Sequence, residues 1–352
     1  MKTKKLIGLS AAAVILVALA YISTQKTEIR TPSEVGKILL PKLDLGKIQQ
    51  IELSKKGDKK LVLKGSDSGW TITSLYNYPA DITKIRKNLL VLKDLKTGQR
   101  ADSSKIANAE LLDLQDESGK SLATLSLGEQ HSRKATGQMA MYGPASIPDG
   151  RYVATGNSEK TYLVNETLTT LNTEPSNWAD TQITDIPSSD INGIAIMHGD
   201  SAQLLSKQDG TWMLSGVEEN EEFDTSKAYY LESALSSLSF KTLADPALNA
   251  EDMGITTGAV FKAMLKNGES YTASLGNEMQ GSTDRYLKIT AAFTPQGTNT
   301  TINTGLKAKI DAFNERTSQW TYVIPSSKAG NMIKTRADLV KEKVKEEKVK
   351  KE

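Results

Sequence analysis

The sequence predicts an α+β fold made of two tandem copies of an antiparallel-sheet-plus-helix unit, placed after an N-terminal transmembrane helix. The spacing of the tryptophans is the first observation behind this prediction. Trp70 and Trp212 lie 142 residues apart (212 − 70), and so do Trp178 and Trp320 (320 − 178). A period this long indicates duplication of a whole domain, because solenoid repeats span only about 20 to 50 residues. The length of 352 residues agrees, since about 150 residues per domain gives two domains.

The composition is that of an ordinary folded chain. Hydrophobic residues make up 38% and charged residues 24%. Lys and Arg number 44 against 42 Asp and Glu, and this balance argues against a general nucleic-acid binder, which needs a large positive field. There is no cysteine, so disulfides, thiolate metal sites and cysteine nucleophiles are excluded.

The N-terminus is typical of membrane targeting. Lysines stand at positions 2, 4 and 5, and the stretch from Leu6 to Ile22 carries no charge. Its length favours a transmembrane anchor over 1–22, while a cleaved signal peptide ending at Ala20 is the alternative. By the positive-inside rule the chain crosses the cytoplasmic membrane once, with its bulk on the periplasmic side. Cleavage would instead give a secreted protein.

Composition also predicts the domain boundaries. A polar segment with two prolines reads as a stalk over 23–44, and mixed lysine and glutamate near the C-terminus suit a solvated tail. The expected parts are the membrane segment 1–22, the stalk 23–44, repeat domain 1 at 45–187, repeat domain 2 at 188–325 and a charged tail at 326–352.

The elements of the first copy follow from hydrophobic periodicity. Ile51, Leu53, Leu61 and Leu63 alternate with polar residues around a turn at 56–58, as in a β-hairpin. A strand containing Trp70 follows. Asp81 then caps a helix whose apolar residues recur at helical spacing, namely Ile82, Ile85, Leu89 and Leu92. Further strands are expected at 112–114, 122–125, 151–153 and 162–164.

The second copy repeats this order. A hairpin turns at His198, a strand contains Trp212, and Asp224 caps a helix with apolar positions at Ala228, Leu231, Leu235 and Leu238. Strands are expected at 260–265, 271–275, 285–287 and 300–302. Because each copy has many antiparallel strands and few helices, the fold class is α+β.

No motif for catalysis, a cofactor or a metal is found. The two histidines, His131 and His198, are not at zinc-ligand spacing, and the acidic run 218–222 lacks the glycine of a calcium loop. Gly-x-Ser-x-Gly does not occur. We therefore predict a protein without enzymatic activity, cofactor or metal. A carboxylate pair that the fold assembles, as in glycosidases, stays open.

The two copies differ most between Gly128 and Arg151. Gly128 aligns with Gly276 at an offset of 148 and Arg151 with Arg285 at 134, so the first copy carries fourteen extra residues (148 − 134). Methionine and tyrosine in such a segment are typical of contact surfaces, although a loop covering its own sheet is an equal alternative. The predicted partner-binding residues are Met139, Met141, Tyr142 and Ile147.

Some of these features also resemble a known family. The positive-then-apolar N-terminus, Gly69-Trp70, the segment 78–81 (Tyr-Pro-Ala-Asp), the leucine-rich helix and a degenerate second copy resemble the bacterial domain of unknown function 4340 family. The resemblance implies a membrane-anchored protein encoded beside ABC-type transporters and gliding-motility-type auxiliary proteins. It implies no activity and no catalytic residues. The second copy departs from the motif and keeps only the capping Asp224.

Together these observations predict a non-enzymatic, membrane-anchored extracytoplasmic accessory or scaffold protein of a transporter-like envelope complex. The N-terminal helix predicts the membrane as a partner, and the balanced charge predicts no nucleic acid. The resemblance implies ABC-type transporter or gliding-motility-type auxiliary subunits as further partners. One alternative is a cell-envelope carbohydrate-binding or carbohydrate-active protein built on the tryptophans and acidic loops. Another is a purely structural envelope protein.

Overall fold

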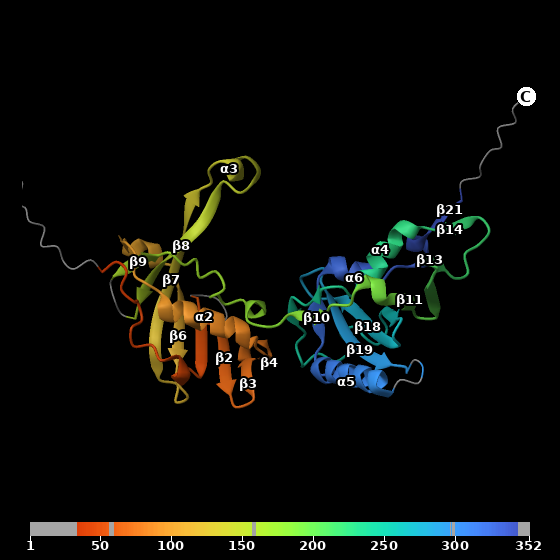
Figure 1. Ribbon diagram of the computed structural model, residues 1–352, viewed down its shortest axis with the longest axis horizontal. Helices are drawn as coiled ribbons and strands as arrows, with labels where there is room; N and C mark the ends of the chain where they lie inside the picture. Colours follow the sequence, from red (N-terminus) through yellow and green to blue (C-terminus); the bar gives the residue numbers. More distant parts are fainter. Residues whose placement is uncertain (1–33, 56–59, 157–159, 296, 298–299, 344–352) are drawn as a thin grey trace, which may run out of the picture. The chain divides into compact units, whose positions relative to one another are not determined.

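The computed structural model describes residues 34–55, 60–156, 160–295, 297 and 300–343. The fold is α+β, with two large antiparallel sheets (Figure 1). The expected membrane segment at 1–22 and the hairpin turn at 56–58 lie outside the described residues. Within the described ranges, no helix combines the length and the apolar character needed to span a bilayer.

The first sheet has nine strands in the order β4-β3-β2-β1-β6-β7-β8-β9-β5. Their bounds are β1 Gln50–Ser54, β2 Leu61–Ser66, β3 Gly69–Ile72, β4 Tyr78–Pro79, β5 Arg100–Ala101, β6 Glu110–Gln115, β7 Ser121–Lys134, β8 Ser146–Thr155 and β9 Thr161–Val164. Alternate residues of the strands are buried, as the hydrophobic pattern predicts, and form the core: Ile51, Leu53, Leu61, Leu63, Leu112, Leu114, Leu125 and Leu127.

Helix α2, Ile82–Asp94, lies across one face of this sheet (Figure 1). Asp81 caps it as expected, because its Oδ1 accepts the backbone N–H groups of Thr83 at 2.8 Å and Lys84 at 3.2 Å. The predicted apolar face is buried at Ile85, Leu89 and Leu92.

The segment 34–44, expected as the end of a stalk, instead pairs with the chain that follows α2. The backbone N–H of Gly36 donates to the Thr97 carbonyl and that of Leu39 to the Leu95 carbonyl, both at 2.7 Å. Leu39 is buried by this contact. This pairing begins at Gly36, nine residues before the predicted start of repeat domain 1 at 45 (45 − 36).

The second sheet has eight strands in the order β13-β12-β11-β17-β18-β19-β20-β16. Their bounds are β11 Ile191–His198, β12 Ser201–Gln208, β13 Thr211–Leu214, β16 Thr242–Leu243, β17 Val260–Leu265, β18 Glu269–Glu278, β19 Arg285–Phe293 and β20 Tyr322–Ile324. This order matches β3-β2-β1-β6-β7-β8-β9-β5 of the first sheet, strand for strand in chain order.

Helix α5, Thr300–Thr317, corrects the strand expected at 300–302. Three consecutive β-branched residues, Thr300 to Ile302, suggested that strand. However, the helical spacing of Ile310, Phe313 and Thr317 places one face of the helix against the sheet, and this packing overrides local propensity. The Asn314 side chain fastens the helix to β19 by bonding both the N–H and the carbonyl of Ala291 at 2.8 Å.

The helix expected after Asp224 is shorter than its apolar pattern indicates. Asp224 caps the 3-10 turn η6, Thr225–Lys227, through the N–H of Ser226 at 3.1 Å, and α4 spans only Ala228–Glu232. Serines follow the end of the helix and compete for backbone carbonyls. The hydroxyl of the C-cap Ser233 donates to the Tyr230 carbonyl at 3.3 Å, and the Ser236 hydroxyl donates to the Ile186 carbonyl at 2.6 Å. Leu238 lies in β15, Leu238–Ser239, which pairs with β10, Gln182–Thr184.

The tryptophans at the shared spacing occupy equivalent places in only one of the two pairs. Trp70 and Trp212 are each the second residue of the matching strands β3 and β13. Trp178 is fully buried and precedes β10 in a two-stranded sheet, whereas Trp320 is half-buried and precedes β20 of the second sheet. Trp212 is buried and Trp70 half-buried. Two of the four tryptophans, Trp178 and Trp212, are therefore buried.

The C-terminal segment is folded as far as residue 343, which the predicted tail at 326–352 did not anticipate. It forms α6 Ser326–Met332, α7 Arg336–Leu339 and β21 Val340–Glu342, with Met332 and Leu339 fully buried. Strand β21 pairs with β14, Glu221–Phe223, so the acidic run is held by this segment instead of forming a free loop.

The remaining short elements are α3 Gln138–Tyr142, η1 Leu45–Lys47, η2 Thr73–Leu75, η3 Ser103–Ile106, η4 Pro175–Asn177 and η5 Ser188–Asp190.

Candidate functional site

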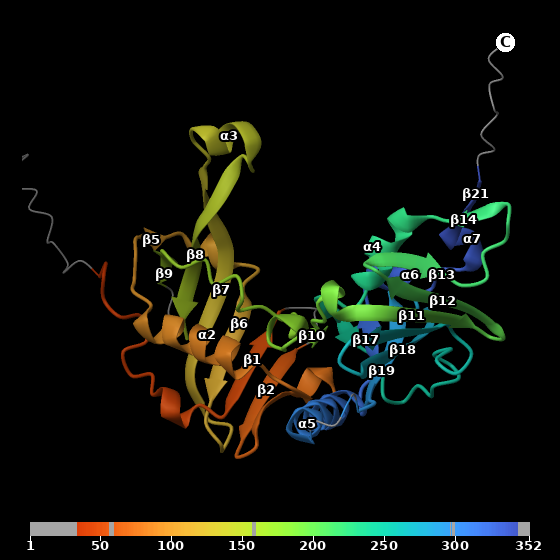
Figure 2. The ribbon, with the colours of Figure 1, turned by 45° about the vertical axis from the view of Figure 1, so that its right-hand side comes forward.

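Strands β7 and β8 continue beyond the first sheet as a two-stranded ribbon, which we call the arm (residues 131–150; Figure 2). The pairing of β7 with β6 reaches only Leu127, and that of β8 with β9 starts at Arg151. Helix α3 lies at the tip of the arm (Figure 2). The fourteen-residue difference between the copies thus forms a projecting ribbon, and not a loop lying over its own sheet.

A β-bulge marks the base of the arm. Leu127 pairs with Val153, but the next pair is Gln130 with Arg151, so β7 carries an extra residue. A Cβ on Gly128 in this bulge would lie 2.3 Å from the Lys105 carbonyl oxygen, so only glycine fits there. Bulges bend and twist a strand, which turns the ribbon away from its neighbours.

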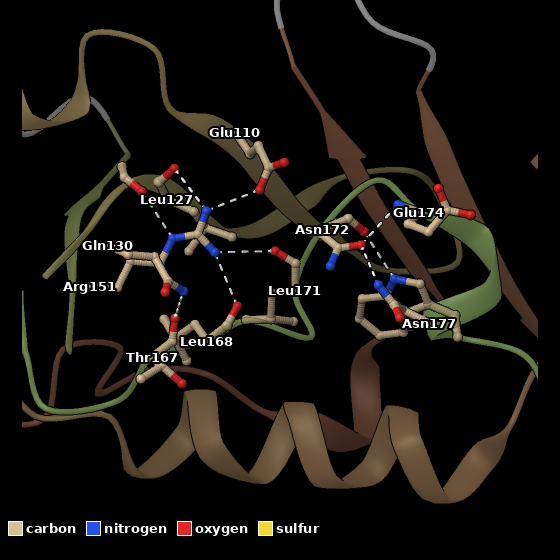
Figure 3. Close-up of polar contacts among 12 residues, drawn as sticks. Glu110, Leu127, Gln130, Arg151, Thr167, Leu168, Leu171, Asn172, Glu174 and Asn177 are labelled. Carbon is tan, nitrogen blue, oxygen red and sulfur yellow. Dashed lines mark hydrogen bonds and ion pairs between the residues drawn. The ribbon is translucent and has the colours of Figure 1, made fainter. Parts of the chain in front are cut away.

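The Arg151 guanidinium fastens the base of the arm from β8 (Figure 3). Its Nη2 donates to Glu110 Oε2 at 3.0 Å and to the Leu127 carbonyl, its Nε donates to the Gly128 carbonyl at 3.0 Å, and its Nη1 bonds two further carbonyls. These two carbonyls belong to Leu168 and Leu171. All five guanidinium N–H groups have an acceptor, so this ion pair, 10% and 15% exposed, is fully satisfied.

A second set of contacts holds the lower part of the arm. His131 Nδ1 lies 2.6 Å from Asp149 Oδ1 across the ribbon, and the Asp149 Oδ2 is 4.0 Å from Arg133 Nε. Gly150 lets the ribbon lie close to β9, because a Cβ at this position would be only 2.4 Å from the Val164 carbonyl oxygen. Two-stranded ribbons are marginal in water, so these contacts explain why this one is formed.

The structure brings the predicted contact residues to different positions on the arm. Met141 and Tyr142 lie together in α3 and are 76% and 88% exposed. Ile147 lies lower, in β8 opposite Arg133, and is half-buried. The backbone of Met139 is in α3, and its side chain lies outside what the structure describes.

A polar cavity in the second sheet was missed by sequence reasoning. Its volume is about 340 Å³, and it is lined by Glu269 and Tyr271 of β18 and by Lys309, Phe313 and Arg316 of α5. Lys309 lies 40 residues from Glu269, so no local motif joins them. The available signal was the alternation of β18, where Glu269 occupies an inward position of the strand.

Neither histidine is part of a metal-binding group. His131 pairs with Asp149, and His198 Nε2 is buried without a hydrogen-bond partner in the described part of the chain. Across the described ranges, no cluster of three or more His, Cys, Asp or Glu side chains is arranged to hold a metal ion.

Comparison with known proteins gives one match. No curated protein and no solved structure matches the chain. The family model described as "Domain of unknown function (DUF4340)" matches residues 70–257. This range runs from Trp70 in β3 to the segment before β17 and covers more than half of the chain. The chain therefore belongs to the DUF4340 family, as Gly69-Trp70 and the segment 78–81 indicated.

Proposed function

We propose that this chain is a non-enzymatic, membrane-anchored accessory or scaffold protein of a transporter-like envelope complex, and that its arm binds another protein subunit. The observation that carries the proposal is the exposure of Met141 and Tyr142 at the tip of the arm. Large apolar side chains exposed together on a projecting element are typical of contact surfaces. The anchor would be the uncharged stretch from Leu6 to Ile22.

The edges of the arm favour contact through the tip over addition of a strand. An open strand edge is a template for pairing with another chain, and charged residues or proline protect it. Arg133 and Lys134 stand on the β7 edge, and Pro148, which lacks an N–H group, stands on the β8 edge. The partner would therefore present an apolar groove to α3, and would not extend the ribbon as a sheet.

We also propose that the two sheets are tandem copies of one unit, in which the arm is the specific addition. The support is the matching strand order and one shared irregularity. In the second sheet, Leu275 pairs with Leu287 and the next pair is Glu278 with Arg285, so β18 also carries an extra residue. These residues correspond to those of the bulge at the base of the arm by the sequence offsets of 148 and 134. Gly276 occupies this bulge as Gly128 does in the first sheet.

The carbohydrate alternative draws less support. Sugar binding of the expected kind needs an exposed aromatic face beside two carboxylates. The cavity by α5 has the carboxylates, but Tyr271 in its wall is only 3% exposed and meets Phe313 edge-on at 5.2 Å between centroids.

Detergent pull-down from native membranes tests the scaffold proposal. The variant Met141→Ser/Tyr142→Ser should lose recovery of transporter subunits identified by mass spectrometry, because the contact surface is removed. Met213→Ser/Tyr229→Ser is the matched control, since these residues are 51% and 68% exposed but belong to β13 and α4 and not to the arm. Equal recovery with both variants would contradict the role of the tip. Absence of transporter subunits from the wild-type sample would contradict the complex itself.

A further inference from the structure

The cavity by α5 contains a carboxylate that is wholly removed from water. The side chain of Glu269 is 0% exposed. Its Oε1 accepts from Asn267 Nδ2 at 3.1 Å and its Oε2 from the Tyr271 hydroxyl at 2.7 Å. Burial, together with the hydrogen bond to Glu269, raises the pKa of Tyr271, so this hydroxyl stays protonated and keeps donating. Such a carboxylate needs a cationic partner, because an unpaired buried charge is strongly destabilising.

That partner is a lysine held mostly in water. Lys309 Nζ lies 2.8 Å from both oxygens of Glu269, yet the lysine side chain is 60% exposed. The two ends of this ion pair are therefore unequal. Released from the cavity, the lysine regains full hydration at little cost, whereas Glu269 cannot be left alone. If the ammonium group of a ligand replaces that of Lys309, the Glu269 carboxylate has a cationic partner both before and after ligand binding.

The charged side chains around Glu269 favour a cationic ligand. Asp180, Asp185 and Asp190 also line the cavity, and none of the three forms an ion pair with any residue that the structure describes. Arg316, the other cationic group in the wall, already donates to the backbone carbonyls of Gln182 at 3.0 Å and Ile183 at 2.8 Å. Arg316 keeps its positive charge, but four carboxylates of the wall outnumber its two cationic side chains, so the cavity attracts cations.

We propose that this cavity binds an aliphatic diamine or polyamine, whose ammonium replaces Lys309 on Glu269 while its methylene stem packs on Leu265, Ile186 and Phe313. A second ammonium would lie near the aspartates at the mouth. The cavity volume of about 340 Å³ is at the small end of the range for ligand pockets, which suits a slender chain. The inference is independent of the scaffold proposal, because its residues lie outside the arm.

Calorimetric titration of the full chain in detergent with 1,5-diaminopentane tests the proposal. The wild type should bind. Lys309→Met should bind about tenfold more tightly, because the competing ammonium is gone, and Glu269→Gln about tenfold more weakly, because the anchoring charge is lost. The control is Lys307→Met on the same helix, whose exposed pair with Asp311 lies outside this cavity wall and whose affinity should equal that of the wild type.

A thermal measurement keeps the test decisive if Glu269→Gln does not fold. Lys309→Met leaves the Glu269 charge unpaired, so its unfolding midpoint should fall, and 1,5-diaminopentane should restore it. The uncharged analogue 1,5-pentanediol should not. A salt bridge that merely fastens α5 to the sheet predicts the same fall without rescue. Absence of binding to both wild type and Lys309→Met, or binding that Glu269→Gln leaves unchanged, would overturn the proposal.

Discussion

The hairpin β7–β8 in the first sheet and the hairpin β18–β19 in the second begin alike and end differently. Each has the same bulge, a glycine in it, and an arginine opposite that donates to the carbonyl of that glycine at 3.0 Å. A Cβ at either glycine would lie 2.3 Å or less from a backbone oxygen. Beyond this point the first hairpin continues as the arm, while the second turns back within a few residues.

The ends of the two hairpins place methionine in opposite surroundings. Met279, after β18, packs against a buried cluster made of Ala244, Met253, Tyr286 and Val323. Met141 at the tip of the arm is 76% exposed. The comparison teaches that the bulge is a structural joint that tolerates either ending. An apolar side chain beyond it serves the core in one hairpin and remains available for contact in the other.

The arginines at the two joints provide the largest expected difference. Arg151→Met should destabilise the protein by about 3 to 5 kcal/mol, because it leaves the carboxylate of Glu110, which is only 15% exposed, unpaired. Arg285→Met should cost about 1 kcal/mol or less, since its partner Glu278 is 52% exposed and stays hydrated. Equilibrium urea unfolding of each variant measures the two losses.

A double variant separates the ion pair from the packing of the arginine stem. Arg151→Met/Glu110→Gln should recover part of the loss, since no buried charge then remains. Equal losses for Arg151→Met and Arg285→Met would show that the two joints depend on their arginines to the same degree. The two hairpins would then differ only in the presence of the arm.

The sequence predicted where the two hairpins diverge, but not the bulge or the arginine contacts that form there. The offsets of 148 at Gly128 and 134 at Arg151 place fourteen extra residues between these two positions. The bulge at Leu127 to Gln130 is visible only in the strand pairing. The number of extra residues followed from these offsets, but their pairing into a ribbon over 131–150 did not. Met141 and Tyr142 were chosen from the composition of the segment, and both are exposed. Ile147 was included on hydrophobicity alone, but its position in β8 leaves it half-buried.

The features that sequence reasoning missed depend on contacts between distant segments. The Glu269–Lys309 pair joins a strand to a helix that was expected to begin as a strand. The charge partner of Arg151 is another example. Glu110 lies 41 residues away, on β6, whereas Arg285 pairs with Glu278, seven residues away. No pattern in either copy reveals which carboxylate the fold will bring to the arginine.

We expect the second hairpin to make the stability of the protein sensitive to acid, because of Asp284. This residue aligns with Gly150 of the arm (284 − 134). Hydrogen bonds from Lys241 Nζ, at 3.0 and 2.8 Å, lower the pKa of the Asp284 carboxyl below its ordinary value of 3.8. The unfolded chain then binds a proton before the native chain does as pH falls. The stabilisation is therefore complete above pH 3.8 and is lost as pH falls through the lower native pKa.

Two variants check this assignment. Asp284→Asn and Lys241→Met should each flatten the fall of the thermal midpoint below about pH 4, because each removes the same interaction. Part of the fall should remain, since the pKa of Asp338 is also lowered, chiefly by the Thr335 backbone N–H. If the slope is unchanged in both variants, the turn of the second hairpin is not a source of acid sensitivity.

Substitutions at the tip of the arm should have the smallest effect on the free energy of unfolding. Met141→Ser/Tyr142→Ser should change the free energy of unfolding by no more than about 0.5 kcal/mol, because both side chains are already in water. Met279→Ser should cost about 1 kcal/mol, because part of its apolar surface is buried against the cluster below the second hairpin. Chemical denaturation of the two variants side by side gives both values. A loss at the tip as large as the loss at Met279 would mean that the tip packs against its own chain, and the reason for assigning it to a partner would disappear.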